Sequence, residues 1–344
     1  MSNHLKVKLF LLDNVIWIML AFFFLICALG IPHFSSYPNI INILYHTTIM
    51  SMLVLAQGFV LMSGNLDLSI DAILAFAPGV VILAASNWLP GYLNPYVCIV
   101  LTLVIGAFIG FLNGVCVSKL GMNAFMQTLS VSIILRGLVL FLIPLAIFPL
   151  DPVYSYIGKV RIEVLGNFPV AIFVTFTIYL IFHIVMKYTI FGRNYMATGG
   201  NSRASYVAGI DTSKMIIMGF VIAGVLSAVA GLLNAGRQDS VSNTMGSGMT
   251  MLAFAGALLG GTSMSGGKGS IFGMLGGAIL LGMFSNALNL LGVEVTLVHA
   301  AQGTLIFLAI LIDRLRVQFR SRLLKNEQLL HLKKDDNTSK VNLD

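Results

Sequence analysis

The chain has 344 residues, of which 58% are hydrophobic and only 10% are charged, and its formal net charge is +7. A soluble domain usually carries about 25% charged residues. The composition therefore excludes an ordinary soluble protein, and the positive charge is no indicator of nucleic-acid binding. Apolar residues come in runs of roughly 17–25, the length that crosses ~30 Å of hydrocarbon as a helix. The sequence predicts an all-α polytopic membrane protein.

Ten apolar runs lie between a polar N-terminal tail and a basic C-terminal tail. The tails are residues 1–14 and 314–344, and the transmembrane domain is 15–313. The predicted spans are 15–31, 41–63, 70–86, 96–118, 129–150, 169–187, 215–235, 249–263, 270–291 and 295–313. We expect about ten transmembrane helices with a weak internal two-fold repeat, the 249–263 segment being short enough for a half-crossing or a re-entrant segment.

The distribution of lysine and arginine predicts the side of the membrane that each end of the chain occupies. With both termini in the cytoplasm, most basic residues fall inside, including the whole C-terminal cluster. Only Lys159, Arg161 and Arg237 fall outside. Cytoplasmic loops of membrane proteins carry the excess of basic residues, so we expect both termini to be cytoplasmic.

Glycines spaced four residues apart indicate close helix packing. Gly106, Gly110 and Gly114 share one face of a predicted span, and Gly273 and Gly277 repeat the spacing in another. Small residues at this spacing let two helix backbones approach, and packing drives helix association in lipid. We expect these glycines to be structural.

Two glycine-rich breaks interrupt the apolar runs. The first is residues 62–71 (MSGNLDLSID) and the second is residues 259–270 (LGGTSMSGGKGS). Broken helices in corresponding places are a pointer to a transport pathway, because non-helical backbone at membrane depth has to be buried in protein or face water. Ser69 and Ser270 are expected to cap the helices that follow. The alternative, that both breaks are ordinary cytoplasmic turns, stays open.

Arg136 is the ionisable residue within a span that most needs an explanation. An intramembrane charge is costly unless it is paired or solvated, so Arg136 is a candidate functional residue. Arg136 lies about seven residues into its predicted span, so we expect it to reach the cytoplasmic surface. His46, His183 and His299 show no metal-ligand spacing and are expected to be polar packing groups. No catalytic constellation is visible, so the chain is not expected to be an enzyme or to hold a cofactor.

A polar, glycine-punctuated stretch, residues 192–210 within the loop 188–214, separates two apolar runs in the middle of the chain. The charge distribution predicts that it lies in the cytoplasm, where a soluble partner can contact it. Ser202 can cap a short helix there, and Gly209 can end it.

With these elements assembled, residues 40–313 resemble the permease subunits of ribose/xylose-type bacterial ABC sugar importers. The resemblance rests on three motifs, at residues 64–69, 192–210 and 257–270. It implies a permease, as a homodimer or heterodimer, that carries a monosaccharide or similar small polar solute across the bacterial inner membrane into the cytoplasm. It implies two further partners: a cytoplasmic ABC ATPase, which binds the ATP, and a periplasmic sugar-binding protein.

Two sets of residues are candidates for function. The two breaks give the predicted substrate pathway: Gly64, Asn65, Asp67, Ser69, Gly260, Gly261, Thr262 and Ser263. The resemblance implies that the middle polar stretch couples the permease to the ATPase, through Gly192, Arg193, Gly199, Gly200, Asn201, Arg203, Ala204 and Gly209.

The chain departs from the family pattern at four positions. Asn65 and Asp71 stand where two glycines are usual in the first break. Thr250 and Leu252 stand where an acidic pair is usual before the third motif. These departures bear on substrate contacts and on pairing with a second permease.

Two other functions stay open. An ion-coupled secondary transporter of a small polar solute needs carboxylates deep in the membrane, and the chain offers only Asp67 and Asp71, both near one predicted surface. An intramembrane enzyme needs paired catalytic groups at depth, and the sequence shows none.

Overall fold

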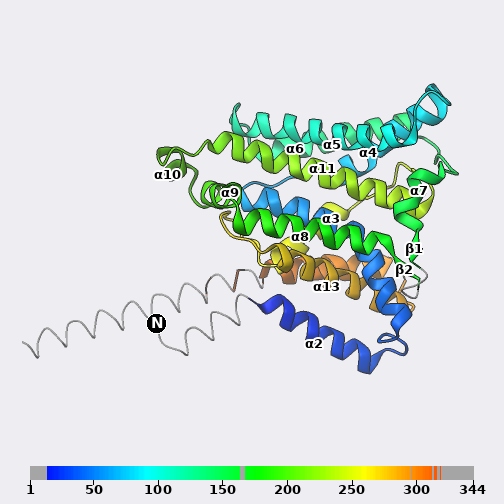
Figure 1. Ribbon diagram of the computed structural model, residues 1–344. Coiled ribbons are helices and arrows are strands. Elements are labelled where there is room, and N and C mark those ends of the chain that lie inside the picture. The colour runs from blue at the N-terminus through cyan, green and yellow to red at the C-terminus, as the bar shows by residue number, and fades with distance from the viewer. Residues whose placement is uncertain (1–13, 163–166, 295, 312–313, 316–317, 319–344) are drawn as a thin grey trace, which may run out of the picture.

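The computed structural model describes residues 14–162, 167–294, 296–311, 314–315 and 318 (Figure 1). The predicted N-terminal tail lies outside these residues except for Asn14, and so does nearly all of the predicted C-terminal tail. The described chain is built from helices, so the prediction of an all-α membrane protein is confirmed.

The helices follow one another in a simple order. They are α2 (Val15–Gly30), α3 (Tyr37–Met62), α4 (Ile70–Leu83) continued by the π-helix η1 (Ala84–Trp88), α5 (Pro95–Ser118), α6 (Ala124–Leu142), α7 (Pro152–Lys159), α8 (Val170–Tyr188), α9 (Ile190–Gly200), α10 (Ser202–Val207), α11 (Thr212–Gln238), α12 (Met249–Leu259), α13 (Ile271–Leu290) and a last helix, Thr296–Leu311. Two short strands, β1 (Arg161–Ile162) and β2 (Phe168–Pro169), pair antiparallel.

Seven helices of the described chain are long and apolar enough to cross a membrane: α3, α4 with η1, α5, α6, α8, α11 and α13. Three further apolar helices, α2, α12 and the last one, are shorter. Each of the ten predicted spans thus contains an apolar helix, while the count of ten crossings and the internal repeat stay predictions.

The span predicted at 129–150 is displaced along the chain. The helix, α6, begins at Ala124, where the Asn123 side chain accepts a hydrogen bond from the first turn, and it ends at Leu142. The residues that follow are apolar, which misled the prediction, but they include Pro144 and Pro149, and proline disrupts a helix interior. They are irregular instead.

Helix α3 lies at the centre of the bundle, between α11 on one side and α8 and α13 on the other (Figure 1). Almost every residue of its C-terminal half is buried. Helices α9 and α10 lie at one end of the bundle, and α7 with the two strands lies at the other. The two ends of the bundle therefore carry different secondary-structure elements.

The predicted glycine contacts are confirmed. Gly106 of α5 packs directly against Gly224 of α11, and a Cβ atom on Gly110 would overlap the carbonyl oxygen of Phe220. Gly277 of α13 contacts α12 at Gly256 in the same way. Backbone packed directly on backbone explains why these positions carry no side chain.

Gly110→Ala is expected to destabilise the protein by about 1–3 kcal/mol, because overpacking has to move one of two helices. The matched control is Gly137→Ala in α6, where a Cβ would have no neighbour within 4 Å. There alanine is expected to be neutral or to stabilise the helix by roughly 0.5–1 kcal/mol. The midpoint of thermal unfolding in detergent measures both. Equal shifts would contradict the packing argument.

Candidate functional site

The three sequence motifs meet at one end of the bundle. Gly64 in the first break, Gly199 in α9 and Gly266 in the second break are in mutual backbone contact: a Cβ on Gly266 would overlap the Gly199 carbonyl oxygen and lie 2.9 Å from Gly64 Cα. The N–H of Gly267 donates to the Met62 carbonyl at 2.9 Å. We call Gly64, Gly199, Gly266 and Gly267 the glycine junction.

Backbone conformation and space both require glycine at this junction. Gly64, Gly266 and Gly267 have φ angles of +80°, +77° and +70°, a region that side chains other than glycine disfavour. Gly199 is helical, but a Cβ there would overlap the carbonyl oxygen of Met62. The three segments can therefore meet only while these positions carry no side chain.

Helix α9 is anchored to the core by Tyr195. Its hydroxyl donates to the Phe59 carbonyl of α3 at 2.6 Å, and its side chain is fully buried. Burial raises the pKa of Tyr195 above its ordinary range, so the hydroxyl keeps its proton. Of the predicted coupling residues, Gly192 is buried against the end of α8 and Arg193 is exposed. Sequence reasoning missed Tyr195, although it is an aromatic residue within an otherwise polar stretch.

The cap of α10 is not the predicted one. Asn201, which follows the exposed Gly200, accepts a hydrogen bond from the Ala204 N–H at 3.0 Å. Ser202 donates instead to the carbonyl of Thr198 at 2.8 Å. The prediction that Ser202 caps this helix is wrong, because the residue before it, with extended backbone, takes the capping position.

Helix α10 presents apolar side chains to solvent. Gly209, with φ +83°, donates to the Tyr206 carbonyl and ends the helix as predicted. Tyr206 is 72% exposed and Val207 is 83% exposed, and Arg203 is exposed beside them. This small surface of mixed apolar and basic character is connected to the glycine junction through α9.

The first break is held in place by polar contacts to two other helices. Asp67 accepts hydrogen bonds from the Ser69 N–H at 2.7 Å and from the Ser69 hydroxyl at 2.6 Å. Asn113 of α5 donates to the same hydroxyl at 3.0 Å, and Thr128 of α6 accepts from Leu68 N–H at 2.9 Å. Burial raises the pKa of Asp67, which lies in the loop between two spans, to about 6.

Of the two predicted serine caps, Ser69 and Ser270, the structure confirms only the second. The Ser69 hydroxyl is bound to Asp67 and makes no capping bond to α4, so that prediction is wrong. Ser270 accepts from the Gly273 N–H at 3.1 Å, so the cap of α13 is confirmed. A neighbouring carboxylate outcompetes the helix backbone for the serine hydroxyl.

The predicted pathway residues of the second break are packed as well. Gly260 is buried directly against Gly273, and Gly261 has φ +88°. Thr262 is fully buried, and Ser263 accepts from Ser265 in a local turn. In the first break the Asn65 side chain donates to Ser63, and its backbone N–H donates to the Val60 carbonyl. These positions form tightly closed backbone, and their assignment to a substrate pathway stays a prediction.

Arg136 forms an ion pair inside the bundle. Its Nη2 lies 3.2 Å from Asp71 Oδ2, and its Nη1 donates to the Met245 carbonyl at 2.8 Å. The expectation that Arg136 reaches the cytoplasmic surface is wrong. Because α6 begins at Ala124, the arginine lies roughly 18 Å along the helix, and a carboxylate meets it there.

Two of the four departures from the family pattern are in contact. The Asp71 N–H in α4 donates to the Thr250 hydroxyl in α12 at 3.4 Å. A carboxylate at position 250 would therefore lie next to the one at position 71. The family pattern has acidic residues in α12, where this chain has Thr250. Here the acidic residue is Asp71 in α4, which pairs with Arg136.

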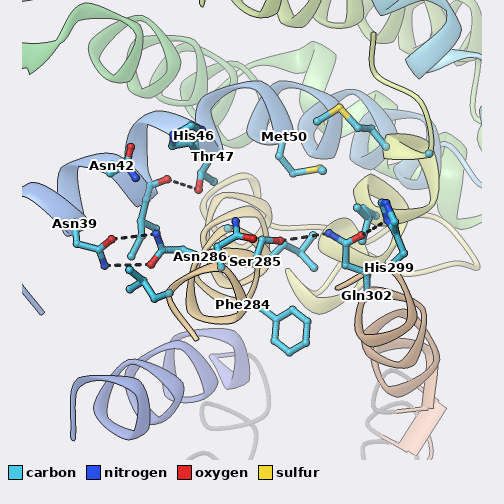
Figure 2. A pocket seen from close by; sticks show the side chains of 18 of the residues that line it. Asn39, Asn42, His46, Thr47, Met50, Phe284, Ser285, Asn286, His299 and Gln302 are labelled. Atoms are coloured by element: carbon cyan, nitrogen blue, oxygen red, sulfur yellow. Dashed lines mark hydrogen bonds between the residues drawn. The ribbon is translucent and has the colours of Figure 1, made fainter. Parts of the chain in front are cut away.

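A large cavity lies beside the N-terminal half of α3, away from the glycine junction at the other end of that helix (Figure 2). Its volume is about 570 Å³, and α3, α13, the start of α12 and the last helix line it. Polar lining side chains include Asn39, Asn42, Asn286, Asn289 and Gln302. Sequence reasoning missed it, although asparagines three residues apart share one face of each apolar helix and were a readable signal.

A bundle of apolar, broken helices, with a polar cavity at one end and a short exposed helix at the other, defines a multi-pass membrane transport protein. Residues 39–312 match the family described as branched-chain amino acid transport system / permease component. The chain belongs to this permease family.

Similar proteins narrow the class. The chain is 31% identical over 315 residues to the ribose import permease of Haemophilus influenzae, covering 91% of this chain and 96% of the relative. It is 34% identical over 298 residues to the ribose import permease of Bacillus subtilis, which covers 86% of this chain and 91% of that relative. It is 30% identical over 293 residues to the D-allose transport system permease of Escherichia coli, covering 84% and 87%. No solved structure matches the chain significantly. The resemblance to sugar-importer permeases is confirmed, and the chain is a permease subunit of a sugar ABC transporter.

Proposed function

We propose that this permease imports a monosaccharide or similar small polar solute into the cytoplasm, driven by ATP hydrolysis in a partner ATPase. The observation that carries the proposal is the glycine junction, where α9 contacts both broken segments through backbone alone. The relatives named as permeases for ribose and D-allose support a monosaccharide.

In this proposal α10 docks on the cytoplasmic ATPase, and a periplasmic binding protein delivers solute at the opposite end. A displacement of α10 is passed by α9 to the end of α3 at Met62 and to the second break at Gly267. Backbone contacts transmit a displacement better than flexible side chains do, because packed interfaces are not continuously deformable. The predicted pathway residues then act as the closed inner gate of the present conformation.

The double variant Tyr206→Ser/Val207→Ser is expected to lose the ATPase partner. Truncating a central aromatic contact costs about 2 kcal/mol or more, which weakens binding more than tenfold. Tyr92→Ser is the matched control, since Tyr92 is 86% exposed but lies outside the α9–α10 end. Co-purification of the ATPase from detergent measures both. Undiminished recovery with the double variant would contradict docking through α10.

The proposed function itself is tested in nanodiscs that hold the permease with its ATPase. Addition of sugar-loaded binding protein is expected to stimulate ATP hydrolysis. A permease that purifies without any ATPase, and that gives no stimulated hydrolysis when one is supplied, would contradict the proposal.

A further inference from the structure

The polar groups of the large cavity indicate the kind of ligand that suits it. Amide, hydroxyl and imidazole side chains supply its polar surface, and the lining contains no aspartate, glutamate, lysine or arginine among the described residues. Amides and hydroxyls each offer both hydrogen-bond donors and acceptors. The cavity therefore suits a ligand that is polar but uncharged.

Part of the cavity wall is fixed by its own hydrogen bonds. Asn39 and Asn286 bond to each other reciprocally, at 3.1 and 3.0 Å, and so join α3 to α13 (Figure 2). Gln302 donates to the Ser285 hydroxyl at 3.4 Å and joins the last helix to α13. The wall is thus pre-formed on three helices, which favours binding.

Other polar groups of the same cavity have no partner. The side chains of Asn42, Ser247 and Asn289 make no hydrogen bond within the part of the chain that the structure describes. The N-terminus of α12, an 11-residue helix, has no side-chain cap, and Gly248 and Met249 line the cavity there. The Met249 N–H already donates to the Gly246 carbonyl at 3.1 Å, so the unpartnered groups of this space are the side chains of Asn42, Ser247 and Asn289.

We propose that this cavity binds a neutral polyhydroxylated solute of monosaccharide size on its way through the permease. This inference rests on the proposed function and adds the site and the chemistry of the cargo. The volume of the cavity, about 570 Å³, falls within the roughly 300–1,000 Å³ that is typical of ligand pockets. A zwitterionic amino acid would bring two charges without partners, which burial penalises.

The cavity is closed toward the glycine junction. It ends at Met50, Leu252 and Leu281. Beyond this floor a Cβ on Gly256 would lie 2.7 Å from the Val54 side chain, so α12 and α3 are in contact there. The bound solute waits in this conformation on the side from which the binding protein delivers it.

The test is ATP-driven uptake of radiolabelled D-ribose, D-allose and L-arabinose by vesicles that hold the permease, its ATPase and its binding protein. Asn42→Leu and Asn289→Leu are each expected to lower uptake about tenfold, because a desolvated hydroxyl loses its partner. Recovery of the ATPase with each variant is measured alongside uptake, to show that the transporter has assembled. Ser130→Leu is the matched control, since Ser130 is an exposed hydroxyl of α6 outside the cavity.

Asn289→Ser keeps a donor and an acceptor, so it is expected to retain uptake even where Asn289→Leu assembles poorly. Wild-type uptake by both leucine variants would overturn the site. Uptake of the free amino acid L-leucine is measured with the same vesicles. If the two variants lose uptake of this amino acid and keep uptake of the monosaccharides, the proposed class of cargo is overturned. A wild-type permease without ATP-dependent uptake of any solute would overturn the proposed function instead.

Discussion

Gly199→Ala is expected to reduce sugar-stimulated ATP hydrolysis to the basal rate. The added Cβ would overlap the Met62 carbonyl oxygen and lie 2.8 Å from the Gly267 nitrogen, the two atoms that bond α3 to the second break. Neither is a side chain that can rotate away. Overpacking of this kind costs about 1–3 kcal/mol, so the unfolding midpoint should fall as well.

The adjacent glycine is the control for this variant. A Cβ on Gly200 would meet only Gly267 Cα, at an ordinary 3.8 Å. Gly200→Ala is therefore expected to retain stimulated hydrolysis, although both glycines belong to the predicted coupling set. Equal activity of the two alanine variants would show that the junction does not transmit the conformational change.

Arg136→Met is expected to destabilise the protein by about 3 kcal/mol, the lower end of the cost of removing one partner of a buried ion pair, because the Arg136 side chain is 25% exposed. The Asp71 carboxylate, whose side chain is only 11% exposed, would keep its charge without a counter-ion. The Met245 carbonyl would lose its donor too. Lys119→Met, at an exposed position, is the control, and denaturation in detergent measures both variants. If Arg136→Met lowers the free energy of unfolding no more than Lys119→Met does, the ion pair does not have the stabilising role described.

The same prediction extends to the position of the carboxylate. Asp71→Gly removes the partner of Arg136, and adding Thr250→Glu supplies a carboxylate from the neighbouring helix. Because the Asp71 backbone contacts Thr250, the double variant is expected to recover much of the stability that the single variant loses. A double variant no more stable than the single one would show that α12 cannot present the charge to Arg136.

Helix content and the order of elements could be predicted because the length of an apolar run is a local property. The glycines of α5 and α13 were predicted on the same basis. Both ends of α6 were missed because hydropathy outweighed local signals: the capping Asn123 at its start and the prolines after Leu142 at its end.

The candidate site depended on contacts that no local pattern contains. Gly64, Gly199 and Gly266 are far apart in the chain, and only the fold brings them together. The bond that draws the Ser69 hydroxyl away from its expected cap, and the partner of Arg136, are likewise set by neighbouring groups that the motifs do not specify. Individual motifs could be recognised from the sequence, but their convergence could not.

The most direct test of the proposed function is solute uptake by sealed vesicles under two energy sources. With the ATPase and binding protein present, the account predicts monosaccharide uptake that requires ATP and is lost with Gly199→Ala. Uptake by the permease alone, driven by a proton or sodium gradient and unaffected by that variant, would contradict it and establish a secondary transporter.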